Sequence, residues 1–481
     1  MKPINAVIPA ATWVPATLVL LFLAAVLFRP LIPVDETRYM TVAWEMFLHR
    51  GWFEPLTMNF EPYHHKPPLL FWLINLSWSV FGISRWAALV PVFLAALGCV
   101  YLTSLLGRLL FPGPLHDQQR PWLIMIGSIP FLIYSTLVMF DVMLCVFVLL
   151  SLIGTVLYAR SRRTSHALIT GVFLGLGVLT KGPVAYLYVL PPLLFAPVWQ
   201  RDFDRTASWY AGCLLIVAVS LLPILGWLIP VLKDSSNDFA FWLIWNQTAG
   251  RITGNFNAAH DRPVYFYLPI LPALFMPWLF LPAFWHGLRG LKGRLGQDEG
   301  MRFLLVWLLP VIIGFSLISG KQPHYLVPLL PGVVMLTALC LEQVRTRTLA
   351  RTFALAVAGF IGLEAIASQT LFIPYDLRPV AEVIRKHPDR DLVFNHHYQG
   401  EIGFLAKLEK PVDDRPRREL KQWFKQHPAG LAIIRYENGQ DVKDYRMIVS
   451  TPHRGKRLGV FSYDPHPRPP GTGRPDAAAQ E

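Results

Sequence analysis

An Asp-Glu pair directly follows the first long apolar segment, in the sequence PVDETRYMTVAWEMFLHRG. A carboxylate at a membrane boundary can act as a general base that takes a proton from an attacking hydroxyl group. Arg38 nearby would keep Asp35 ionised but also make it less basic. The structural alternative is that Asp35 caps a helix and Glu36 adds a favourable first-turn charge. In both interpretations the segment up to His49 is an amphipathic helix at the membrane surface.

A lysine lies between two histidines and two prolines in YHHKPPLLFW. The prolines restrict the backbone and place Lys66 just before another half-apolar helix. Lys66 either reaches phospholipid headgroups or binds a substrate phosphate. His64 and His65 are candidate metal ligands, although nothing else in the sequence requires a metal or any other cofactor.

Two carboxylates fall inside apolar segments. Asp141 interrupts the apolar sequence VMFDVM, and a charge at mid-span costs about 2.5–3.5 kcal/mol, so it needs a partner. That partner is either a structural lysine or arginine, or part of a functional site. Glu364 lies deep in the last apolar segment, far along the chain from the other motifs, and we expect it to be an internal hydrogen-bond partner.

Three further cations occupy short turns that are rich in Gly or Pro: Lys181 in LTKGP, Arg251 in NQTAGRITG and Lys321 in SGKQPHYLVP. Each alone is typical of a headgroup contact. A phosphate leaving group, however, needs cations that neutralise its developing charge. Together with Lys66, these residues predict a phosphate-binding site.

The elements that must position these residues are membrane spans. Of the 481 residues, 53% are hydrophobic and 16% are charged, and the apolar residues form blocks of about 20, enough to cross a bilayer. The net charge of +13 lies largely in short loops without interleaved aromatics, which argues against nucleic-acid binding. All four cysteines lie inside apolar blocks, without metal-ligand spacing. The predicted spans are 9–31, 86–110, 121–139, 142–159, 166–180, 183–199, 207–231, 264–285, 302–319, 325–341 and 353–373.

The distribution of Lys and Arg sets the orientation of these eleven spans. If KPPLLFWLINLSWSVFG lies in the interface and the N-terminus is cytoplasmic, every cytoplasmic loop is short and basic, for example at Arg160, Arg162 and Arg163. If that stretch spans instead, the basic loops face outward. The first arrangement places the outer loop 33–85 and all the polar candidates on the non-cytoplasmic face. A shared face for residues from separate segments predicts a constructed site.

The chain changes character after Pro374. DLVFNHH, GLAIIRY and KRLGVFSYD are typical of short strands, and RPVAEVIRKH and RRELKQWFKQ of helices. We therefore predict an all-α membrane domain over 1–374, a small α/β domain over 375–464 on the outer side, and a disordered tail over 465–481.

Six stretches resemble, in order, the multi-span lipid-phosphate-sugar glycosyltransferases (GT-C), in particular the protein O-mannosyltransferase and aminoarabinose transferase branch. They are DETRYMTVAWEM, YHHKPPLLFW, VMFDVM, GLGVLTKG, FWLIWNQTAGRITG with PVYFYLPILPALFMPW, and FSLISGKQPHYLVPLLP. The sequence departs from the aminoarabinose transferases at His65, where they usually carry an acidic residue. The resemblance implies that Asp35 is the catalytic base, with Glu36 beside it and Asp141 in the site. The candidate residues for the carrier phosphate and the cavity are Arg38, Tyr63, Lys66, Lys181, Arg251, Lys321 and Tyr325.

The predicted function is transfer of a sugar, with inversion, from undecaprenyl phosphate to an acceptor such as lipid A, another glycan or a protein. The predicted location is a bacterial inner membrane, with the site on the periplasmic side. The alternative is a transporter of lipid-linked sugars, which would also need cations for phosphate. A transporter should carry polar residues through both halves of the bilayer, whereas these candidates gather at one face.

Overall fold

The computed structural model describes residues 10–115, 117–201, 203–204, 206–233, 262–395 and 397–463. These residues form two compact units. The helical unit comprises the described residues of Met1–Arg29, His49–Thr57 and Pro62–Ala367. The sheet unit comprises those of Pro30–Leu48, Met58–Glu61 and Ser368–Glu481. Arg251 and the predicted disordered tail over 465–481 lie outside the described residues.

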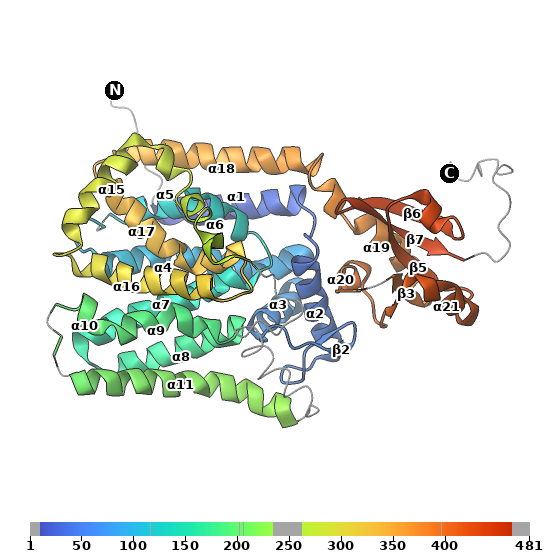
Figure 1. Ribbon diagram of the computed structural model, residues 1–481, viewed down its shortest axis with the longest axis horizontal. Helices are drawn as coiled ribbons and strands as arrows, with labels where there is room; N and C mark the ends of the chain where they lie inside the picture. Colours follow the sequence, from blue (N-terminus) through green and yellow to red (C-terminus); the bar gives the residue numbers. More distant parts are fainter. Residues whose placement is uncertain are drawn as a thin grey trace. The chain divides into compact units, whose positions relative to one another are not determined.

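The helical unit is built from helices that run alongside one another (Figure 1). Its first half contains α1 (Ala10–Phe28), α3 (Leu69–Phe81), α4 (Arg85–Leu110), α5 (Gln119–Gly127), α6 (Ile129–Tyr134), α7 (Phe140–Ser161), α8 (Thr164–Lys181), α9 (Val184–Leu194), α10 (Ala196–Trp199) and α11 (Thr206–Lys233). Its second half contains η2 (Val264–Tyr267), α14 (Leu271–Leu274), η3 (Trp278–Phe280), α15 (Pro282–Arg294), α16 (Glu299–Leu317), η4 (Pro323–Leu329), α17 (Leu330–Cys340) and α18 (Thr346–Ser368).

Six stretches of helix among the described residues are long and apolar enough to cross a membrane: Arg85–Leu110, Phe140–Ser161, Thr206–Lys233, Glu299–Leu317, Pro323–Cys340 and Thr346–Ser368. The chain is therefore an integral membrane protein, as predicted, and the count of eleven spans stays a prediction. The stretch predicted to lie in the interface forms α3, which has 13 residues. At 1.5 Å per residue it is about 20 Å long, too short to cross a hydrocarbon core of about 30 Å.

Close helix packing sets the position of the residues discussed below. In the helical unit, α7 packs between α4 and α8, and α8 packs against α11. A Cβ atom at Gly171 would lie 2.6 Å from the Ile216 carbonyl oxygen, and one at Gly175 would lie 2.4 Å from the Ser220 carbonyl oxygen. Gly171 and Gly175, four residues apart on α8, therefore allow the backbones of α8 and α11 to come into close contact. Small residues often have this role between membrane helices.

Several predicted spans are not single α-helices, and prolines lie at the breaks in two of them. The stretch 121–139 divides into α5 and α6 around Ser128, whose backbone is extended, and Pro130 follows in the first turn of α6. The stretch 264–285 consists of short helical turns, with Pro272, Pro277 and Pro282 along it. A proline removes a backbone donor and clashes with the preceding turn, so closely spaced prolines break a helix that hydropathy alone predicts as continuous.

The sheet unit holds α2 (Asp35–His49) and a five-stranded mixed sheet. The strand order is β4 (Asp413–Arg415), β3 (Leu392–Asn395), β5 (Leu431–Tyr436), β7 (Lys456–Ser462) and β6 (Arg446–His453). β3 pairs in parallel with β4 and β5, and the pairs β5–β7 and β6–β7 are antiparallel. Its other elements are η5 (Ile373–Tyr375), α19 (Arg378–Arg385), α20 (Gly403–Ala406), η6 (Arg417–Glu419), α21 (Leu420–Gln426) and η7 (Gly439–Val442).

The sheet separates two apolar clusters. Val380 and Ile384 of α19 pack on one face with Ile433, and Trp423 of α21 packs on the other with Ile434. The small C-terminal α/β fold is confirmed, while its boundary at residue 374 stays a prediction. The elements β4, α20 and the edge strand β6 were not predicted from the sequence. The same is true of the short strands β1 (Thr57–Met58) and β2 (Glu61–Pro62) in the loop 33–85.

Candidate functional site

The helical unit contains a buried ion pair between two predicted site residues. Asp141 lies in the first turn of α7, and Lys181 is the last residue of α8. Because α7 and α8 are neighbours joined by a very short loop, the start of one and the end of the other lie at the same end of the unit. The Lys181 Nζ donates a hydrogen bond to the Asp141 Oδ1, and the two side chains are 8% and 1% exposed.

An aromatic residue from a third segment adjoins this pair. The Lys181 Nζ lies 4.7 Å from the ring centroid of Tyr325 in η4, close enough for a cation–π interaction. The backbone carbonyl of Tyr325 accepts a hydrogen bond of 2.6 Å from the hydroxyl of Tyr188, a fully buried residue of α9. The ring that covers Lys181 is thereby fixed by a neighbouring helix.

Lys66 and Tyr63 reach the same region from the loop before α3. The Lys66 Nζ lies 6.0 Å from the ring centroid of Phe140, the residue before Asp141. The Phe140 ring packs edge-on against the Phe71 ring, with centroids 5.5 Å apart, and the Phe71 ring packs edge-on against the Tyr63 ring, with centroids 6.4 Å apart. A continuous series of contacts therefore joins five predicted residues, namely Tyr63, Lys66, Asp141, Lys181 and Tyr325.

Lys321 has a different environment. Its side chain is buried, and its Nζ donates a hydrogen bond of 2.8 Å to the Arg262 carbonyl oxygen. The next residue, Gln322, accepts through its carbonyl from the Tyr267 hydroxyl at 3.2 Å. These bonds connect the turn before η4 to η2 and to the segment just before η2. Lys321 thus has a structural partner, and its predicted contact with a phosphate stays a prediction.

The remaining acidic candidates lie in the sheet unit, at the start of α2. The Arg38 guanidinium donates a hydrogen bond of 2.7 Å to the Asp35 Oδ1, and the Asp35 side chain is half exposed. The Tyr39 hydroxyl lies 3.4 Å from the same oxygen. Glu36 is buried, and its Oε2 accepts the Ile32 backbone N–H at 3.0 Å. Glu36 therefore stabilises the turn into α2, whereas Asp35 presents its carboxylate to solvent.

The histidine pair before Lys66 forms a stacked arrangement, with His64 and His65 ring centroids 4.9 Å apart. Among the described residues, no group of three or more His, Cys, Asp or Glu side chains could hold a metal ion. The metal role of the two histidines thus stays a prediction, as does the role of Arg251, which lies outside the described residues.

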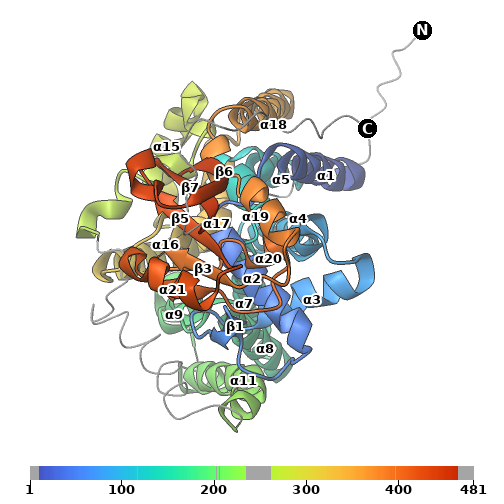
Figure 2. The same cartoon turned by 90° about the vertical axis from the view of Figure 1, so that its right-hand side faces the viewer.

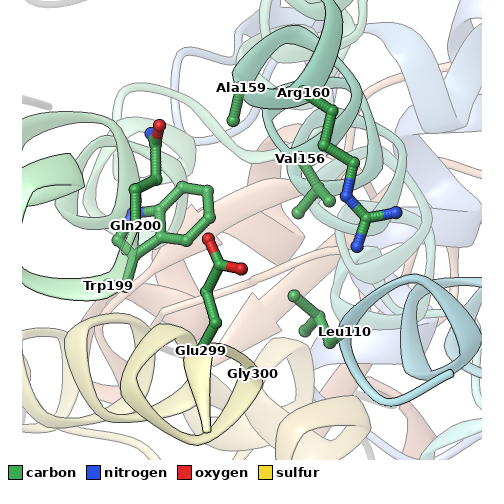
Figure 3. A pocket seen from close by; sticks show the side chains of 8 residues that line it. All are labelled: Leu110, Val156, Ala159, Arg160, Trp199, Gln200, Glu299 and Gly300. Carbon is green, nitrogen blue, oxygen red and sulfur yellow. The ribbon is translucent and has the colours of Figure 1, made fainter. Parts of the chain in front are cut away.

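A cavity of about 60 Å³ lies at the opposite end of α7 (Figure 3). It is lined by Leu110, Val156, Ala159, Arg160, Trp199, Gln200, Glu299 and Gly300. None of the predicted site residues lines it, and Arg160 belongs to a basic loop predicted to be cytoplasmic. This cavity is therefore distinct from the candidate site.

The comparisons with known proteins support the resemblance seen in the sequence. The family model for dolichyl-phosphate-mannose-protein mannosyltransferase matches residues 65–227. An undecaprenyl phosphate-alpha-4-amino-4-deoxy-L-arabinose arabinosyl transferase 1 of Pseudomonas fluorescens is 32% identical over 63% of this chain and 52% of its own length. The corresponding transferase of an Enterobacter species is 27% identical over 86% of this chain and 73% of its own length. The resemblance to lipid-phosphate-sugar glycosyltransferases is confirmed.

The solved structures extend this relation to the fold. The crystal structure of ArnT from Cupriavidus metallidurans bound to undecaprenyl phosphate superposes with a TM-score of 0.72, over 94% of this chain and 97% of that chain, at 16% identity. The same protein in the apo state gives a TM-score of 0.73. The chain thus has the same fold as ArnT. It spans only about half the length of the P. fluorescens relative. The transporter alternative gains no support from these comparisons.

Two aromatic residues of the site, Phe140 and Tyr188, were missed in the sequence. Phe140 and Tyr188 determine where Lys66 and Tyr325 lie, yet each stands among many apolar residues. The signal that could have found Phe140 is its position directly before the one carboxylate in VMFDVM.

Proposed function

We propose that this protein transfers a sugar, with inversion, from an undecaprenyl phosphate carrier to an acceptor at the periplasmic face of a bacterial inner membrane. The acceptor would be lipid A, another glycan or a protein. The observation that carries the proposal is the series of contacts among Lys66, Asp141, Lys181 and the Tyr325 ring. Two lysines from separate segments therefore lie at one end of the helical unit, and ammonium groups suit a phosphate.

The charge distribution along α7 supports the orientation. Asp141 lies at its N-terminal end, whereas Arg160 lies in its last turn and Arg162 and Arg163 follow it. Basic residues mark cytoplasmic ends, so the end with Asp141, Lys181 and Lys66 is the periplasmic one. The eleven-span arrangement, with loop 33–85 and the domain over 375–464 on that side, is part of this proposal.

The proposed chemistry assigns separate roles to the two groups of residues. Asp35 takes the proton of the acceptor hydroxyl as its oxygen attacks the anomeric carbon. The bond from that carbon to the phosphate oxygen breaks, and undecaprenyl phosphate leaves on the opposite side. Lys66 and Lys181, with Arg251, stabilise the negative charge that develops on the phosphate. Asp141 holds Lys181 in place, and Tyr325 covers it.

The test is transfer from a panel of polyprenyl-phosphate sugars to lipid A, glycan and peptide acceptors by the protein in reconstituted membranes. Asp35→Asn should lower kcat by about 10²–10⁴-fold, the usual contribution of a general base. Asp389→Asn, at an exposed acid of the sheet unit, is the matched control. Lys66→Ala should chiefly raise the KM for the donor, against Lys292→Ala in α15 as its control. Transfer by Asp35→Asn at the wild-type rate would remove Asp35 as the base.

A further inference from the structure

The helix that carries Asp35 cannot hold its position alone. α2 has 15 residues, and an isolated helix of that length is marginal in water. Ten of its residues are nevertheless buried, among them Thr41, Trp44 and Glu45. Within the sheet unit, both views place α20 of the C-terminal domain beside α2 (Figures 1 and 2). Contacts with this domain therefore contribute to the position of α2.

Thr41 is the centre of these contacts. Its hydroxyl donates a hydrogen bond of 2.8 Å to the Gly400 carbonyl oxygen and accepts one of 3.0 Å from the Phe404 N–H. The side chain is 1% exposed, so neither backbone group can turn to water instead. One hydroxyl thus links α2 to both ends of the loop 400–404.

The loop is shaped to receive this threonine. Gly400 has φ +78°, a conformation that side chains other than glycine rarely adopt. A Cβ atom at Gly403 would lie 2.4 Å from the Thr41 Cγ2, so only glycine allows the approach. A Cβ atom at Gly400 would lie 3.4 Å from the Arg38 Cα. The loop therefore packs against the turn of α2 that contains the partner of Asp35.

Further hydrogen bonds extend the contact along the same face of α2, since positions three and four apart share a face. The Trp44 Nε1 donates to the Leu408 carbonyl oxygen at 2.7 Å. The Glu45 carboxylate accepts the backbone N–H groups of Asn59 and Phe60, at 2.7 and 2.8 Å. The Asn59 side-chain amide in turn exchanges two bonds with the Val412 backbone, at 2.9 and 2.8 Å.

The same loop also carries a buried acid that acts on Arg38. Burial raises the pKa of Glu401, while the nearby charge of Arg38 acts in the opposite direction. The Glu401 carboxylate accepts the Gln399 N–H at 2.7 Å, which holds it in the loop. Arg38 thus bonds the Asp35 carboxylate and also interacts electrostatically with an acid of the C-terminal domain.

We infer that the C-terminal α/β domain positions the proposed catalytic base, with Thr41 as the positioning residue that joins α2 to the loop 400–404. The inference rests on the proposed function, because it gives the domain a part in that reaction. Thr41 itself touches no reacting atom. It fixes the axis of α2, and with it the direction in which Asp35 presents its carboxylate.

The test compares Thr41→Val with Thr41→Ser in the full-length protein. Valine matches threonine in shape but removes the hydroxyl, and with it the hydrogen bonds to the Gly400 carbonyl and the Phe404 N–H, whereas serine keeps the hydroxyl. Thr103→Val is the matched control, because the hydrogen bond that the Thr103 hydroxyl makes among the described residues is to the Cys99 carbonyl oxygen of its own helix. Hydrogen exchange of α2 peptides and steady-state transfer kinetics are measured on each variant.

We expect Thr41→Val to speed exchange in α2 by about tenfold. It should lower kcat by about ten- to a hundredfold, since small misplacements of catalytic groups are costly, and leave the KM for the donor within about twofold. Thr41→Ser and Thr103→Val should resemble the wild type. Trp44→Phe, which removes a single donor, provides a milder variant with the same direction of change should Thr41→Val fail to fold.

Two results would overturn the inference: unchanged exchange in α2, or faster exchange in α2 with an unchanged kcat. Both are distinct from a failure of the proposed function, which would show as a wild-type protein that transfers sugar from none of the polyprenyl-phosphate donors.

Discussion

The Asp141–Lys181 pair allows structural and functional roles to be separated by a double-mutant cycle. Both side chains are almost fully buried, and removal of one partner from a buried pair leaves an uncompensated charge. Such losses cost about 3–5 kcal/mol, whereas replacing both partners is often neutral or stabilising. We therefore expect Asp141→Asn and Lys181→Met each to lower the free energy of unfolding by about 3–5 kcal/mol. The double variant should recover most of that loss.

Four native cysteines can report unfolding in this measurement. Cys99, Cys145, Cys213 and Cys340 are all free and buried, so a thiol-reactive fluorophore labels them only as the helical unit unfolds. Thermal unfolding curves of the wild type, both single variants and the double variant complete the cycle. A loss below about 1 kcal/mol in either single variant, the range of an exposed pair, would refute the assignment of a buried ion pair.

Transfer kinetics on the same four proteins test the functional role. If Lys181 contacts the carrier phosphate, transfer stays low in the double variant although its stability returns, because the cation is still missing. If the pair is purely structural, transfer returns together with stability. Recovery of wild-type transfer by the double variant would therefore refute the phosphate role of Lys181.

Three further predictions concern charges outside this pair. Glu364 forms an ion pair with Arg29 at 3.1 Å, and both side chains are 5% exposed. Glu364→Leu should therefore lower the free energy of unfolding by about 3–5 kcal/mol without changing the KM for the donor. Thermal unfolding and transfer kinetics measure these two quantities. Burial lowers the pKa of His453 to about 4, so below pH 6.5 the unfolded chain binds more protons than the folded chain. Stability of the sheet unit should therefore fall by about 1–3 kcal/mol between pH 6.5 and 4, and His453→Gln should remove that dependence from hydrogen exchange in β6 and β7. Burial lowers the pKa of Lys407 to about 8, so its labelling by an amine reagent should show a midpoint near pH 8, whereas exposed lysines titrate near about 10.4.

The sequence predicted well those features that depend on local pattern. The helix at Asp35 follows from amphipathic spacing, and the strands β3, β5 and β7 follow from short apolar runs that contain β-branched and aromatic residues. The edge strand β6 was missed because its first residues, Arg446 to Ile448, are exposed. Its sequence therefore lacks the apolar alternation on which strand prediction depends.

The buried pairs show what a sequence can and cannot say about charges in a membrane. The free-energy cost of a charge inside a membrane predicts that Asp141 and Glu364 each have a partner. The structure confirms a partner for each of them. Which cation would serve each acid could not be predicted, because the Arg29–Glu364 pair joins residues at opposite ends of the helical unit's sequence. Long-range pairing of this kind is determined by helix packing, which hydropathy does not describe.

Burial alone does not distinguish a functional pair from a structural one here. Arg29 and Glu364 are as enclosed as Asp141 and Lys181. The neighbours differ: Arg29 also bonds the Thr136 side chain and backbone carbonyl, so both of its terminal amino groups bond protein oxygens. Around Lys181 the neighbour is instead the face of the Tyr325 ring, and Lys66 approaches over Phe140. Aromatic faces hold a cation without neutralising its charge. Lys181 therefore has an aromatic face and a second lysine nearby, whereas the Arg29 guanidinium bonds protein oxygens on two sides. For this reason we assign the phosphate role to the Asp141–Lys181 pair and a structural role to the Arg29–Glu364 pair.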